Sequence, residues 1–124
     1  MSGIAGKFIK SFSHAMRGIA ILFKTQLNAR IELSITVVVV IAGILFNIST
    51  SEWLAILLCI ALVLGLEGIN TSIEIMLDKL HPDFDTEIGK AKDVAAGAVL
   101  IAAIVAAIIG FTIFAPRLLD LFNQ

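Results

Sequence analysis

Three long apolar runs constrain the fold of this 124-residue chain more than any other feature. The first extends from Leu33 to Phe46, the second from Trp53 to Leu80 with polar residues from Glu67 onward, and the third from Val94 to Ala115. The third can cross ~30 Å of hydrocarbon alone, whereas the first needs flanking residues or local thinning of the bilayer. Because strands of a lone chain this short would have to close a barrel in lipid, we expect helices.

The composition agrees with a membrane protein. Hydrophobic residues make up 59% of the chain and charged residues 15%, where a soluble domain carries about a quarter. The length allows one domain, and the net charge of −1 gives nucleic-acid binding no electrostatic support. We therefore predict one all-α integral membrane domain over residues 1–124.

The N-terminal segment predicts an amphipathic helix that lies in the membrane interface. Over residues 4–27 apolar side chains recur every three or four positions, and basic side chains fall on the opposite face. Residues 1–30 also lack the pattern of a cleavable signal peptide. We assign 1–30 to this surface helix, and 31–47, 52–80 and 90–118 to transmembrane helices. Ser51 is expected to cap the second span, Pro82 to end it, and Thr86 or Gly89 to precede the third.

The basic residues predict the orientation. Eight of the nine Lys and Arg residues lie before residue 32 or between 78 and 93, and only Arg117 lies elsewhere. The positive-inside rule then places residues 1–32, with the N-terminus, and residues 78–93 on the cytoplasmic side of the membrane. Residues 47–52 and the C-terminus face outward, with Trp53 as an interfacial anchor.

One polar stripe interrupts the second span. On a helix its members lie within an arc of about 100°, at ~100° per residue. Ionisable groups in a membrane cost about 2.5 kcal/mol or more each, so they need a partner, a proton or a cation. Mg²⁺ takes one or two carboxylates together with phosphate oxygens and water. The stripe comprises Glu67, Asn70, Thr71, Glu74 and Asp78.

The third span begins with Lys90, Lys92 and Asp93, where a helix N-terminus and two lysines suit phosphate. Carboxylates for a metal and lysines for phosphate at one membrane face fit phosphoryl transfer, although no Walker A motif is present. Three alternatives stay open. The stripe could be polar packing between helices, a relay for ions or protons, or part of a silent scaffold.

These same segments resemble the prokaryotic diacylglycerol kinase family. The resemblance rests on EGINTSIE at 67–74 with Asp78 four residues on, and on AKDVAAGAVL at 91–100. It extends to SFSHA at 11–15, Arg17-Gly18 and NARI at 28–31, and thus covers nearly the whole chain. It implies a homotrimer of three-span subunits that uses MgATP to phosphorylate diacylglycerol or, alternatively, undecaprenol. The SFSHA sequence at 11–15 is more similar to the branch of the family that contains undecaprenol kinases.

The resemblance also implies residue roles. Glu67 matches the general base, Glu74 a metal ligand and Lys92 a lysine that contacts ATP phosphates. The nucleotide set further includes Arg17, Asn70, Asp78, Lys90 and Asp93, and the residues lining the lipid side are Arg30, Glu32 and Thr71.

One position departs from the family pattern. Gln26 stands where the family usually has a second metal-binding glutamate, and an amide offers no charge to Mg²⁺. Metal affinity is then weaker, or another acid such as Glu32 substitutes, or activity is lost. On a helix continued through residue 30, Gln26 and Arg30 fall on the apolar side, which would turn both into the bundle.

Overall fold

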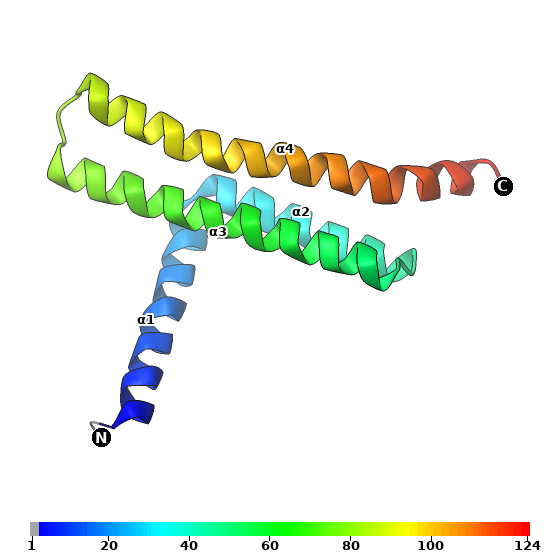
Figure 1. Cartoon of the computed structure of the whole chain (residues 1–124), viewed down its shortest axis with the longest axis horizontal. Coiled ribbons are helices and arrows are strands. Elements are labelled where there is room, and N and C mark those ends of the chain that lie inside the picture. The colour runs from blue at the N-terminus through cyan, green and yellow to red at the C-terminus, as the bar shows by residue number, and fades with distance from the viewer. Residues whose placement is uncertain (1–2) are drawn as a thin grey trace.

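The computed structural model describes residues 3–124 as four helices, with no strand in that range. They are α1 (Ile4–Thr25), α2 (Leu27–Leu45), α3 (Thr50–Leu80) and α4 (Thr86–Phe122). The helices α3 and α4 lie side by side, α2 packs on α3, and α1 leaves the bundle at a steep angle (Figure 1). Since α2, α3 and α4 are each long and apolar enough to cross a membrane, the all-α, multi-pass prediction is confirmed.

The predicted surface helix ends earlier than expected, at a break centred on Gln26. This residue has an extended backbone (φ −110°, ψ 116°), and it closes α1 and starts α2. Its N–H donates to the Leu22 carbonyl, and the Thr25 hydroxyl donates to the Ile21 carbonyl. The prediction of one helix through residue 30 was therefore wrong, and so was the helical projection of Gln26. The location of α1 at a membrane surface stays a prediction.

The connection between α2 and α3 is tight. Ser49, not the predicted Ser51, caps α3, because its hydroxyl accepts from the Glu52 N–H while the Glu52 carboxylate accepts from the Ser49 N–H. This reciprocal capping box satisfies two backbone donors at once. Asn47 turns the chain with a positive φ of 50°, a conformation that asparagine tolerates well.

The connection between α3 and α4 is also short. α3 ends at Leu80 just before Pro82, as predicted. Asp85 caps α4 by accepting from the N–H groups of Glu87 and Ile88. α4 thus begins at Thr86, four residues before the predicted 90, and continues to Phe122 beyond the predicted 118.

The best-buried apolar cluster lies beside the α2–α3 connection. Ile48, Ile56 and Ile113 form its centre, and Trp53 packs around them. Gly43 lets the Trp53 ring approach α2, since a Cβ at Gly43 would lie 2.6 Å from the ring. Most large apolar side chains elsewhere are exposed, which suits helices whose surroundings are lipid.

Candidate functional site

The polar stripe of α3 is partly buried within the chain. Glu67, Asn70 and Thr71 are only 3%, 7% and 4% exposed, Glu74 is half-buried and Asp78 is exposed. The spacing of these residues on α3 keeps them on one face, as the sequence predicts. The stripe therefore runs from the interior of the bundle to the end that carries the α3–α4 connection.

A carboxyl group from α2 joins this stripe. Glu32 lies close enough to Glu67 for their charges to interact, and so does Glu74. The Glu32 Oε2, Asn70 Oδ1 and Thr71 Oγ1 atoms are buried and have no hydrogen-bond partner within residues 3–124. Buried polar atoms are normally satisfied, so these three are candidates to meet a ligand.

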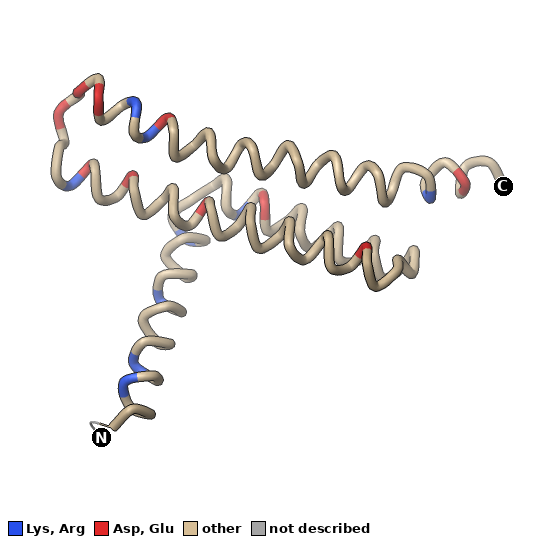
Figure 2. Tube along the Cα trace, in the orientation of Figure 1, with Lys and Arg blue, Asp and Glu red and all other residues tan. Residues whose placement is uncertain are grey.

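The nucleotide residues gather at the α3–α4 connection, where Figure 2 shows acidic and basic residues close together. Lys92 of α4 forms an ion pair with Asp78 of α3, while the exposed Lys90 pairs with Glu87 at 3.1 Å. Asp93 is exposed. The expected juxtaposition of lysines with the stripe is thus present for Lys92.

The expected helix terminus is displaced. Since α4 begins at Thr86, Lys90 and Lys92 lie in its second turn rather than at its start. Two of the terminal N–H groups are already bound by Asp85. The predicted start of this helix at Lys90 was therefore wrong, and phosphate binding by the two lysine side chains stays a prediction.

Three predicted residues form no ion pair or side-chain hydrogen bond with the stripe within residues 3–124. Arg17 is exposed on α1, Arg30 is exposed on α2, and neither forms an ion pair within the described chain. Gln26 is half-buried, and its side-chain amide donates to the Thr25 hydroxyl at 3.3 Å. The structure therefore leaves the roles proposed for these three as predictions.

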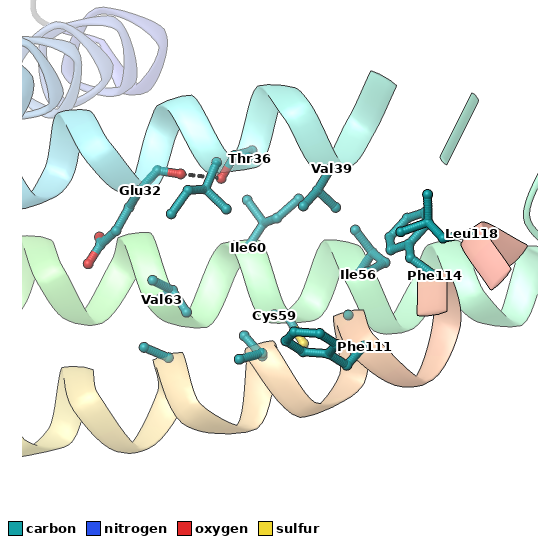
Figure 3. A pocket seen from close by; sticks show the side chains of 15 residues that line it. Glu32, Thr36, Val39, Ile56, Cys59, Ile60, Val63, Phe111, Phe114 and Leu118 are labelled. Atoms are coloured by element: carbon teal, nitrogen blue, oxygen red, sulfur yellow. Dashed lines mark hydrogen bonds between the residues drawn. The ribbon is translucent and has the colours of Figure 1, made fainter. Parts of the chain in front are cut away.

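An apolar groove of about 410 Å³ lies over α3, between α2 and α4. Figure 3 shows Glu32 at one end of it, reaching from α2 toward α3, and Phe114 and Leu118 toward the other. A second hollow, of about 610 Å³, lies between the C-terminal half of α1 and α3, and Thr71 lines it together with Gly18 and Gly68. Neither hollow could be predicted from the sequence, because the walls of each come from separate helices.

The donor atoms of the stripe are compatible with a hard divalent cation. No group of three or more His, Cys, Asp or Glu residues suited to a metal occurs within the part of the chain described. Mg²⁺, however, is commonly bound by only one or two carboxylates plus phosphate oxygens and water. The half-buried Glu74 and the unsatisfied Asn70 Oδ1 supply oxygen ligands of this kind.

An ion pair that was not predicted from the sequence lies at the end of the bundle opposite the α3–α4 connection. Arg117 of α4 binds Glu52 of α3 in a two-pronged contact of 2.8 and 2.9 Å and also donates to the Ile113 carbonyl. The pattern Ser-x-x-Glu at 49–52 could have identified the cap, but nothing in the sequence pairs Glu52 with Arg117. This pair ties α3 to α4 far from the stripe.

Fold and site together define a multi-pass helical membrane protein with embedded carboxylates near a Lys–Asp pair. The family model described as prokaryotic diacylglycerol kinase matches residues 13–114, and the chain belongs to that family. This membership places it among the lipid kinases, which transfer phosphate to an alcohol and use a nucleotide and a divalent metal.

Two relatives extend along nearly the whole chain. It is 41% identical over 117 residues to the undecaprenol kinase of Bacillus subtilis, covering 90% of this chain and 91% of the relative. It is 38% identical over 119 residues to the diacylglycerol kinase of Synechocystis, covering 95% of this chain and 68% of that relative.

Proposed function

We propose that this protein transfers the γ-phosphate of MgATP to the hydroxyl group of a membrane lipid alcohol. The observation that carries the proposal is Glu67, a carboxyl group 3% exposed in an apolar helix, on the same stripe as the Asp78–Lys92 pair. Diacylglycerol is the acceptor that we expect first, and undecaprenol is the alternative.

Glu67 acts as the general base in this proposal. It accepts the proton of the lipid hydroxyl as that oxygen forms a bond to the γ-phosphorus. The bond between this phosphorus and the β–γ bridging oxygen breaks, and ADP leaves. Glu67 is only 3% exposed, and this burial keeps competing water away from the reacting oxygen.

The other residues of the site bind and orient the nucleotide, the metal ion and the lipid. Lys92 moves from Asp78 to the ATP phosphates. Asn70 and Asp78 bind the nucleotide. The remaining nucleotide-binding residues are Arg17, Lys90 and Asp93. Glu74 would hold the metal ion, and Gln26 would be the weakened second ligand. When bound, Mg²⁺ neutralises phosphate charge. Arg30, Glu32 and Thr71 line the lipid side.

The proposal also includes where the active site faces and how the chains assemble. The excess of basic residues at the stripe end of the bundle supports a cytoplasmic active site in a bacterial inner membrane. The family resemblance and the small side chains along α4 support a homotrimer. The mass of the detergent-solubilised complex, corrected for bound detergent, tests the trimer.

The deciding experiment is an ATP-dependent phosphorylation assay on the purified full chain in mixed micelles. Diacylglycerol and undecaprenol are offered in parallel, with and without Mg²⁺. Phosphate transfer to either lipid supports the kinase, and the ratio of the two rates identifies the preferred acceptor. Transfer to neither, from well-assembled protein, would favour a silent scaffold or an ion-translocating role.

A further inference from the structure

The proposed site is divided between two helices. α3 carries Glu67 and Glu74, the proposed general base and metal ligand, whereas α4 carries Lys92. The distance between the carboxyl groups and the lysine therefore depends on how far one helix is shifted along the other. One helical turn is about 5.4 Å, so a shift by a fraction of a turn takes Lys92 out of hydrogen-bonding range of a phosphate held on α3.

Two polar contacts fix this shift directly. Within residues 3–124, the side-chain hydrogen bonds and ion pairs between α3 and α4 are Asp78 with Lys92 at one end and Glu52 with Arg117 at the other. From Val94 to Pro116, α4 carries no charged residue (Figure 2). Apolar contact between helices is non-directional, and packed helices can slide past each other by small amounts.

The pair at the nucleotide end cannot hold the helices during the reaction, because Lys92 leaves Asp78 for the ATP phosphates in the proposed function. Apart from the connection at 81–85, the Glu52–Arg117 pair is then the polar contact that remains between α3 and α4 in the described chain. It is therefore placed to keep the axial position of α4 while the other pair is open.

The Glu52–Arg117 pair is anchored to the backbone of both helices. The Arg117 guanidinium donates to both Glu52 carboxylate oxygens, at 2.8 and 2.9 Å, and to the Ile113 carbonyl of its own helix at 2.7 Å. The Glu52 carboxylate in turn accepts from the Ser49 N–H at 2.9 Å. A planar, two-pronged contact that is fixed at both ends has little freedom, so it determines how α3 and α4 lie along each other.

We infer that Arg117 is a positioning residue of the kinase. Through Glu52 it keeps α4 aligned with α3, so that Lys92 meets the nucleotide phosphates beside Glu67 and Glu74. The inference rests on the proposed function and adds to it a residue at the opposite end of the bundle. Arg117 and Glu52 are 31% and 25% exposed, and ion pairs with such exposure usually stabilise a protein only slightly. We therefore expect loss of the pair to alter the site rather than the melting temperature.

Cross-linking at the nucleotide end measures the alignment without activity. In a Cys59→Ser background, Asp78→Cys and Lys92→Cys together remove the inner pair and place one thiol on each helix. A short bifunctional thiosulfonate joins the thiols in micelles, and intact mass separates linkage within one chain from linkage between copies. Adding Arg117→Gln should slow the linkage within one chain several-fold. Asp120→Asn, which removes a charge at an exposed position of the same helix end, should leave the rate unchanged.

Steady-state kinetics gives the second arm of the test. Glu52→Gln breaks the ion pair but still allows the capping box, because glutamine can replace glutamate there. In Glu52→Gln and in Arg117→Gln, kcat/KM for ATP should fall roughly tenfold, since small misplacements far from the chemistry lower rates. The KM for the lipid should not change, because the residues proposed to line the lipid side lie on α2 and α3.

Two further variants show whether the residues act through each other. The double variant Glu52→Gln with Arg117→Gln should be no worse than either single variant, since both remove the same contact. Arg117→Lys should recover part of the loss, because it keeps the charge without the fork. If Arg117→Gln fails to assemble, Glu52→Gln carries both measurements.

Other results overturn the inference in distinguishable ways. An unchanged cross-linking rate in Arg117→Gln would show that α4 keeps its position without the pair. A fall in kcat with both KM values unchanged, together with a lower melting temperature, would assign the pair to stability alone. Slower cross-linking in a protein that phosphorylates no lipid would support the alignment of the helices by Arg117 and refute the proposed kinase.

Discussion

Glu67 occupies a costly position, since a carboxyl group in a membrane span destabilises insertion by about 2.5 kcal/mol or more. Two further carboxyl groups, Glu32 and Glu74, lie near enough to interact with it. Such a cluster in apolar surroundings needs a proton, a cation or a hydrogen-bond donor to be stable. The substrates of a lipid kinase supply all three.

Replacing Glu67 by Gln tests its role as general base. The substitution keeps size and shape but removes proton acceptance, so kcat should fall by about 10²–10⁴-fold, the usual contribution of a general base. The assay is phosphorylation of diacylglycerol and undecaprenol in micelles, with chromatography to confirm the same assembly. Asp120→Asn, the same chemical change at an exposed position, is the control. Near-normal turnover of the Glu67 variant would remove this residue from the base role.

Replacing Gln26 by Glu tests whether this position is a weakened metal ligand. A carboxylate binds Mg²⁺ more strongly than an amide oxygen, so half-maximal activity should be reached at a several-fold lower Mg²⁺ concentration. Titration of Mg²⁺ at fixed ATP measures this shift. Gln124→Glu makes the same change at the exposed C-terminal residue and should leave the titration unchanged. An identical curve for both variants would place Gln26 outside the metal site.

The sequence predicts the stripe and the lysines at the same membrane face, but not the individual contacts that the stripe makes. Five polar residues share one face of α3 because helical periodicity alone sets their direction. The approach of Glu32 depends on how α2 packs against α3, and the Asp78–Lys92 pair depends on the turn between α3 and α4. Neither contact is encoded locally, although the chemistry of both sets of residues could be recognised in advance.

At the scale of the elements, the apolar runs in the sequence predict where the helices lie, but they do not predict the residues at which the helices begin and end. Ser49 and Ser51 are both plausible caps, and the choice falls on Ser49 because Glu52 can reciprocate. The helical periodicity of the sequence continues through residue 27, but the backbone is extended at Gln26. At Ser49 the boundary is set by hydrogen bonds between side chains and nearby backbone groups, which periodicity does not detect.

The packing of α2 on α3 depends on Gly43. A methyl group at this position would lie 2.6 Å from the Trp53 ring and 3.2 Å from Ile48, so Gly43→Ala should destabilise the protein by about 1–3 kcal/mol through overpacking. Thermal unfolding in detergent, followed by circular dichroism, measures the loss. Gly97→Ala is the control, because a Cβ there meets nothing within 4 Å and alanine favours the helix by up to about 1 kcal/mol. Equal stability of both variants would contradict the close approach seen at Gly43.

At the scale of the molecule, charge is distributed unevenly along the bundle. No charged residue occurs between Asp93 and Arg117, and α1 carries basic residues along its length (Figure 2). Composition and run length alone therefore predict a helical membrane protein. The groove between α2 and α4 could not be foreseen in this way, because three separate helices build it.

The orientation of this bundle decides whether ATP can reach the Asp78–Lys92 pair. In a Cys59→Ser background, we expect a membrane-impermeant maleimide to label Ser51→Cys in intact spheroplasts, and Asp83→Cys only in inverted vesicles. Both positions are exposed, in or beside opposite connections of the bundle, so each serves as the other's control. This pattern follows from the eight basic residues that lie at the Asp83 end or in the N-terminal segment. Labelling of Asp83→Cys from outside the cell would put the nucleotide residues on the side that lacks ATP, and would overturn the kinase proposal together with the topology.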